Sequence, residues 1–187
     1  LLYSMGLKTQ DQIDEFFDAD YSAHLLDPYL FNDMDKAIRR ILQAVEKKER
    51  IVIYGDYDTD GVCSTIVLYS ALLALGVKAE VYIPDRFEEG YGLNKKALSE
   101  ITREGKGGLI VSVDCGITNV EEVEYARERG MDVIIVDHHI SPPNLPKAYA
   151  IVNPKRDGEE YPFKSFCAAG VVFKVIFALL KSDYAKK

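Results

Sequence analysis

The chain has 187 residues, and its 48% hydrophobic and 28% charged residues are typical of a folded globular domain, which excludes a disordered chain. With 23 Lys and Arg against 30 Asp and Glu, the net charge of −7 argues against a protein that grips nucleic acid through basic excess alone. No apolar run approaches the roughly 20 residues that span a bilayer, so we expect no membrane partner.

The predicted elements begin with a helical segment at residues 1–50. Asn32 is placed to cap a helix that runs to position 47, with apolar residues on one face. From residue 51 onward, short β-branched runs alternate with longer helical patterns. We expect strands at 51–54, 78–83, 109–113, 132–136 and 148–152. We expect helices at 62–75, at 94–104, from a cap at Asn119 to Gly130, and at 168–180.

This alternation predicts an α/β fold of the doubly wound class. The sheet is expected to be mainly parallel, with about five strands and helices on both faces, because parallel strands need crossover connections. The division we expect is a helical N-terminal segment at 1–50 and an α/β domain at 51–187. The three scattered cysteines indicate a reducing, cytoplasmic setting rather than a disulfide framework.

Acidic and histidine residues collect where three predicted strands end. They are Asp56, Asp58 and Asp60 after the first strand, Asp114 after the third, and Asp137, His138 and His139 after the fourth. The carboxyl ends of parallel strands form the ligand-binding edge of such a sheet. Carboxylates gathered there repel unless cations neutralise them, and oxygen ligands with one or two imidazoles suit Mn²⁺ or Mg²⁺. The sequence therefore predicts a metal cluster.

Two other interpretations of the loop after the first strand invite comparison. Residues 56–61 begin like a calcium-binding loop, but Val67 stands where that loop needs a glutamate. A phosphatase of the haloacid-dehalogenase type also places D-x-D after its first strand, with the first aspartate as nucleophile. That alternative stays open, although it does not account for the two adjacent histidines.

The ordered set of motifs resembles the DHH phosphoesterases. Asp-Thr-Asp at 58–60, Asp114 and Asp-His-His at 137–139 match the first three motifs of that family. Further stretches resemble its RecJ group of single-strand exonucleases: 54–61, 83–86, 89–94, 113–117 and 152–155. The resemblance extends over nearly the whole chain.

The resemblance implies a metal site and a catalytic set. The implied metal ligands are Asp58, Asp60, Asp114 and His138, of which Asp58 and Asp114 also belong to the catalytic set. His139 is implied to contact the scissile phosphate or to act as an acid toward the leaving oxygen. The pyrophosphatase branch has a histidine where this chain has Tyr54, so the resemblance implies either that Asp56 compensates or that this metal site binds more weakly. Asp137 is expected to be a ligand or to support one.

Four residues are candidates for contact with the substrate. Arg86 either binds a phosphate or pairs with the acids at 88–89. Tyr91 is a candidate platform for stacking a base, and Gly92 lets the backbone approach the substrate, although a plain turn explains them as well. Asn94 completes the set.

The function that the resemblance implies is metal-dependent phosphodiester hydrolysis with two Mn²⁺ or Mg²⁺ ions. The specific activity that the resemblance implies is that of a 5′-to-3′ exonuclease, which degrades single-stranded DNA in repair and recombination. The implied partners are single-stranded DNA, a single-strand-binding protein and a helicase. The alternatives are a phosphodiesterase or pyrophosphatase for small substrates, and a non-catalytic scaffold.

The chain departs from the family pattern in one respect. The family has a fourth metal-binding aspartate on a later strand, followed by a DHH-associated and an oligonucleotide-binding domain. The acids that follow His139 are Asp157, Glu159, Glu160 and Asp183, and none of them follows a convincing predicted strand. We therefore expect the second metal site, and the domain at 51–187, to be incomplete, with weak or absent activity.

Overall fold

A five-stranded, entirely parallel sheet forms the centre of the protein in the computed structural model, which describes residues 1–18, 20–103 and 107–182. The strands are β1 (Arg50–Tyr54), β2 (Glu80–Tyr82), β3 (Gly108–Val113), β4 (Met131–Val136) and β5 (Ala150–Val152). Their order is β2-β1-β3-β4-β5. The chain thus leaves β1 toward one side and continues from β3 toward the other, which places the topological switch point between β1 and β3.

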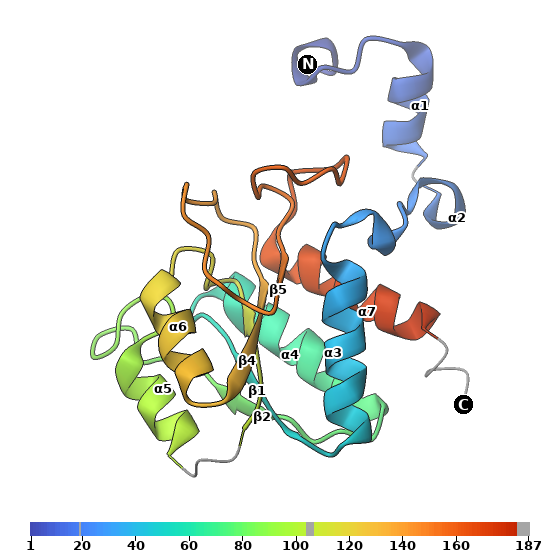
Figure 1. The fold of residues 1–187 in the computed structure, drawn as a ribbon. Helices are drawn as coiled ribbons and strands as arrows, with labels where there is room; N and C mark the ends of the chain where they lie inside the picture. The colour runs from blue at the N-terminus through green and yellow to red at the C-terminus, as the bar shows by residue number, and fades with distance from the viewer. Residues whose placement is uncertain (19, 104–106, 183–187) are drawn as a thin grey trace.

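Helices cover both faces of the sheet (Figure 1). One face carries α3 (Met34–Glu46), α4 (Thr59–Ala74) and α7 (Ala168–Lys181), and the other carries α5 (Lys95–Thr102) and α6 (Val120–Glu128). Side chains alternate along β1, so that Ile51 and Ile53 join the first core while Val52 and Tyr54 join the second. Because both faces are buried, the strands are apolar runs, as the sequence indicates.

Short elements precede α3. They are η1 (Tyr3–Met5), α1 (Gln10–Phe17), α2 (Tyr21–His24) and η2 (Pro28–Leu30). Figure 1 shows α1 extending away from the layered body, whereas α3 lies against it. Ile38 and Ile41 of α3 belong to the same apolar core as the strands. The predicted segment at 1–50 therefore contributes one full helix to the layer over the sheet.

The predicted fold class is confirmed, but the predicted cap at Asn32 is wrong, and Asn119 stands at the predicted cap position without a side-chain cap hydrogen bond. The Asn32 amide donates to the Gly158 carbonyl, and α3 starts after Asp33, whose carboxylate accepts a backbone N–H of β5 instead of capping the helix. Asn119 does precede α6, yet its side chain binds the backbone of Leu93. In both places a partner distant in sequence has replaced the local cap.

Two further observations bear on the predictions. Position 104, the predicted end of the helix that starts at 94, lies outside the described residues. Among the residues that are described, no helix combines the length and the apolar character needed to cross a membrane.

Candidate metal centre

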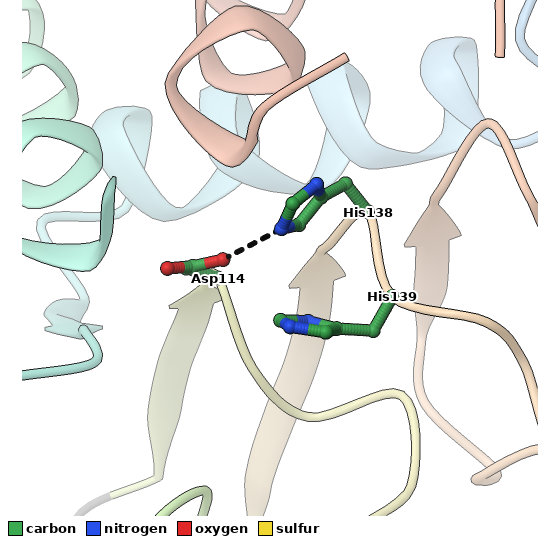
Figure 2. A group of neighbouring side chains, drawn as sticks. All are labelled: Asp114, His138 and His139. Carbon is green, nitrogen blue, oxygen red and sulfur yellow. Dashed lines mark ion pairs between the residues drawn. The ribbon is translucent and has the colours of Figure 1, made fainter. Parts of the chain in front are cut away.

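The acidic residues meet at the carboxyl ends of β1 and β3, on either side of the switch point. Asp56, Asp58 and Asp114 each bring a carboxylate oxygen within 4.8 Å of the other two. Asp114 also forms a second such group with His138 and His139, which follow β4 (Figure 2). Asp114 is therefore shared by two neighbouring groups of ligand atoms, which is the arrangement expected of a bridging ligand.

The loop between β1 and α4 is held tightly against the start of that helix. Asp58 caps α4, because its carboxylate accepts the Gly61 N–H at 2.9 Å. A Cβ atom at Gly61 would lie 2.5 Å from the Asp56 carbonyl oxygen, so only glycine allows this approach. The D-x-D spacing thus fixes Asp58 at the cap and Asp60 in the first turn.

Asp60 joins the start of α4 to the start of α7. Its two carboxylate oxygens accept the N–H groups of Ala168 at 2.7 Å and Ala169 at 2.9 Å. These N–H groups lack intrahelical partners, and the positive end of the helix dipole stabilises a carboxylate there. Nε2 of His138 lies 3.7 Å from the same carboxylate, so Asp60 remains at the rim of the site.

Asp114 is a buried carboxyl group that lacks a hydrogen-bond partner for one of its oxygens among the described residues. Its side chain is 2% exposed, and Oδ1 has no hydrogen-bond partner among the described residues, although His138 Nε2 lies 3.2 Å away. Burial, and then the charges of Asp60 and Asp58, raise the pKa of Asp114 to about 8. The residue also has a φ of 63°, a left-handed conformation that costs energy for a side chain other than glycine.

Asp56, like Asp114, is a buried carboxyl group with one oxygen that lacks a partner among the described residues. It is 3% exposed, and its Oδ1 likewise has no hydrogen-bond partner within the described chain. Burial raises the pKa of this carboxyl group as well. Two buried carboxylate oxygens without partners, on adjacent strands, fit a divalent cation, since buried charges are otherwise paired.

The ring of His138 is oriented by a carbonyl from far along the sequence. Its Nδ1 lies 2.8 Å from the carbonyl oxygen of Phe166, a contact that assigns the proton to Nδ1. Nε2 is therefore left with its lone pair, directed toward Asp114 (Figure 2). A carbonyl that holds the other nitrogen is the usual support of a metal-binding histidine.

Asp137 holds the two histidines from behind. It is fully buried, and it accepts the N–H groups of Ile117, His138 and His139, as well as Nδ1 of His139 at 2.7 Å. Burial alone would raise the pKa of Asp137, but these hydrogen bonds and the His139 charge outweigh burial and lower it. The same hydrogen bond raises the pKa of His139. Asp137 is thus placed to support His139 rather than to face the carboxylates.

Tyr91 connects the loop between β2 and α5 to Asp114 and His139. Its hydroxyl lies 3.1 Å from the carbonyl oxygen of Asp114 and 3.1 Å from Nδ1 of His139. The Tyr91 ring packs edge-on against the His139 ring. Part of the Tyr91 side chain remains exposed, so the ring stays available beside the site.

Gly92 and Asn94 shape the loop from within. Gly92 has a φ of 87°, and a Cβ atom there would lie 2.7 Å from the Asn119 side chain. Asn94 caps α5 and donates to the hydroxyl of Tyr54 at 3.0 Å. Tyr54 itself is buried in the second core, away from the carboxylates.

Arg86 lies exposed above the loop that carries the aspartates. Its guanidinium group is 5.2 Å from the centre of the Tyr57 ring. Within the described residues it forms no ion pair with Glu88 or Glu89, the partners considered from the sequence. The predicted phosphate contact therefore stays compatible with its position.

The acids that follow His139 lie elsewhere. Glu159 binds the backbone of Asn32 and Tyr161, while Asp157 and Glu160 are exposed. Within the described chain none of the three joins either ligand group. Asp183 lies outside the described residues.

The N-terminal domain of the DHH family matches residues 50–187. The chain therefore belongs to the DHH family.

Within that family the chain is similar to RecJ exonucleases. The single-stranded-DNA-specific exonuclease RecJ of Bacillus subtilis is 46% identical over 183 residues, which are 96% of this chain and 23% of that protein. A crystal structure of exonuclease RecJ bound to manganese gives a TM-score of 0.73 at 34% identity, over 81% of this chain and 38% of that one. RecJ of Thermus thermophilus in complex with Mn²⁺ gives 0.66 at 29% identity, over 81% of this chain and 21% of that one.

These matches confirm the predicted resemblance to the RecJ group. The chain spans about a quarter of the length of the curated relatives it matches.

Proposed function

We propose that this chain carries the metal-binding part of an exonuclease that hydrolyses single-stranded DNA from its 5′ end. The observation that carries the proposal is the position of Asp114, which is buried, lacks a partner for Oδ1 among the described residues, and is shared by two ligand groups at the switch point. The identity to RecJ exonucleases over most of the chain supports the substrate.

The donor atoms fit Mn²⁺ or Mg²⁺. We assign the ions to Asp58, Asp60, Asp114 and His138, with Asp56 as a further oxygen donor. Hard oxygen ligands with one imidazole suit these ions, and the RecJ structures described above contain manganese. When bound, such ions lower the pKa of a coordinated water and balance the charge on the phosphate.

The chain's own residues would then orient and protonate the substrate. His139 is held by Asp137 through Nδ1, which leaves its Nε2 to face a phosphate or the leaving oxygen. Because the hydrogen bond that Nδ1 donates to the Asp137 carboxylate raises the pKa of His139, the imidazole keeps a proton to give closer to neutral pH. Tyr91, at 3.1 Å from Nδ1, limits the rotation of the ring.

The setting proposed for this activity is the cytoplasm, with single-stranded DNA as the partner; the three cysteines are free thiols, as a reducing compartment requires. The single-strand-binding protein, the helicase, and a fourth aspartate that completes the second metal site stay predictions of the family resemblance. The residue roles given above are proposals of the same kind.

The test uses the intact protein that contains this chain. A 3′-labelled single-stranded oligonucleotide is incubated with Mn²⁺, and its 5′-mononucleotide products are separated over time. We expect stepwise shortening from the 5′ end, little action on duplex DNA, and no reaction in the presence of a chelator. Hydrolysis of small phosphate compounds without any shortening of the oligonucleotide would instead favour the small-substrate alternative.

A further inference from the structure

The turn that follows β5 is fastened to His139. Asn153 is fully buried, and its Nδ2 donates to the carbonyl oxygen of His139 at 2.9 Å. The Oδ1 atom of the same side chain accepts the N–H of Lys155 at 2.7 Å. One buried amide therefore sets the position of Lys155 relative to His139.

Lys155 differs from the cations next to it. Arg156 donates to Asp33 at 2.7 Å and lies 3.9 Å from Glu159, and Lys164 donates to the Glu159 carbonyl. Lys155 is exposed, and among the described residues its ammonium group has no ion-pair or hydrogen-bond partner. The turn thus presents one unpaired cation while its neighbours stabilise the fold.

The backbone of Lys155 lies close to that of His139, because both bind the side chain of Asn153. A chain with a net charge of −7 needs local positive charge wherever an anionic substrate enters. Lysine suits a phosphate oxygen as a point charge, without demanding one geometry.

We propose that Lys155 binds an oxygen of the same substrate phosphate that His139 meets. This inference rests on the proposed function, because it places the substrate at His139. The contact is to the phosphate and not to a base, so it contributes affinity that is independent of sequence.

The test measures binding of deoxythymidine 5′-monophosphate, the product expected from a thymidine strand, by calorimetry with Mn²⁺ present. The matched pair of variants is Lys155→Ala and Lys147→Ala. Both residues are exposed and both changes remove one positive charge, but Lys147 precedes β5 and lies toward the opposite edge of the sheet. Lys155→Arg keeps the charge and serves as the rescue.

We expect Lys155→Ala to weaken binding about tenfold, the cost of one hydrogen bond to a charged group. The slope of log affinity against log salt should also fall by about 1, as for the loss of one phosphate contact. Lys147→Ala and Lys155→Arg should bind like the wild type, and thymidine without phosphate should not distinguish the variants.

Equal binding by Lys155→Ala and Lys147→Ala would overturn the inference, and so would failure of the Mn²⁺-loaded wild type to bind the monophosphate. If the Lys155→Ala loss is observed but the intact protein does not shorten oligonucleotides, the phosphate contact stands and the exonuclease proposal falls.

Discussion

The amino and carboxyl ends of the parallel strands, called here the amino edge and the carboxyl edge, differ in how their buried charged groups are paired. At the amino edge, the Arg40 guanidinium is 5% exposed and lies 2.6 Å from both Glu49 and Asp132. At the carboxyl edge, the buried Asp56 and Asp114 each retain an oxygen without a hydrogen-bond partner in the described chain. At the first edge a guanidinium lies between two carboxylates, whereas at the second edge carboxyl groups lie next to one another.

This difference separates a structural cluster from a functional one. Burial of a carboxylate without a partner is unfavourable, so such groups persist where a ligand compensates for them. The left-handed backbone at Asp114 adds to that cost. A buried carboxyl group without a partner on a strained backbone is expected at a functional site, whereas an ion-pair cluster such as that of Arg40 is expected to stabilise the fold.

The largest effect is expected from Asp114→Asn, which keeps the shape and tolerates the left-handed backbone. Nuclease turnover should fall by more than about 100-fold, because altering residues that only support a ligand already costs 10- to 100-fold. Initial rates of oligonucleotide shortening measure this. The matched change at the other edge, Asp132→Asn, should leave turnover close to wild type, and equal losses in the two variants would erase the distinction between the edges.

Next in size is the effect of Arg40→Leu on stability. Removal of the guanidinium leaves Glu49 and Asp132 without their cation, and we expect a loss of about 3 kcal/mol in the free energy of unfolding, at the low end for broken buried pairs because Asp132 is partly exposed. Urea denaturation measures the change. Mn²⁺ affinity should be retained, and a variant that is stable but no longer binds metal would contradict the assignment of Arg40 to structure.

When metal is removed by a chelator, the carboxyl edge should also make stability depend on pH. Because the pKa of Asp114 is raised to about 8, the folded state holds a proton that the unfolded chain releases near its ordinary value of 3.8. The stability contributed by this group is complete below that ordinary value and is lost as the pH rises through about 8.

Urea denaturation in a chelator, from acid to alkaline pH, measures this dependence. The wild type should lose stability relative to Asp114→Asn as the pH rises, and saturating Mn²⁺ should stabilise the wild type but not Asp114→Asn. Parallel profiles of the two proteins in the chelator would show that Asp114 is not an uncompensated charge.

The smallest of these effects concerns His139. The Asp137 hydrogen bond is the main cause of its raised pKa, so Asp137→Asn should bring the pKa of His139 down toward its ordinary value of 6.5. Titration of the His139 ring protons by NMR, without metal, reports the change. An unchanged His139 pKa in this variant would remove the support that Asp137 is proposed to give.

Local sequence patterns predict the layers of the fold and the edge at which the ligands gather. The alternating elements indicate a parallel sheet, and the residues after each strand indicate its carboxyl edge. The strand order is not contained in those patterns, because it depends on which crossover goes to which side. The switch point between β1 and β3 therefore emerges only from the structure.

The supports of the site also escape prediction, because they come from distant segments. Asp60 binds the start of α7 across 108 positions, and the Phe166 carbonyl orients His138 from 28 positions away. A backbone carbonyl has no sequence signature at all. Tertiary partners also bind the side chains of Asn32, which does not cap α3, and of Asn119, which stands at the cap position of α6 without a cap hydrogen bond.

Calorimetric titration of the chelator-treated chain with Mn²⁺ tests the central claim most directly, with Asp114→Asn and Asp132→Asn compared side by side. The account predicts binding by the wild type and by Asp132→Asn, and loss of binding in Asp114→Asn. Unchanged Mn²⁺ binding by Asp114→Asn, or its loss in Asp132→Asn alone, would contradict the assignment of the metal centre to the carboxyl edge.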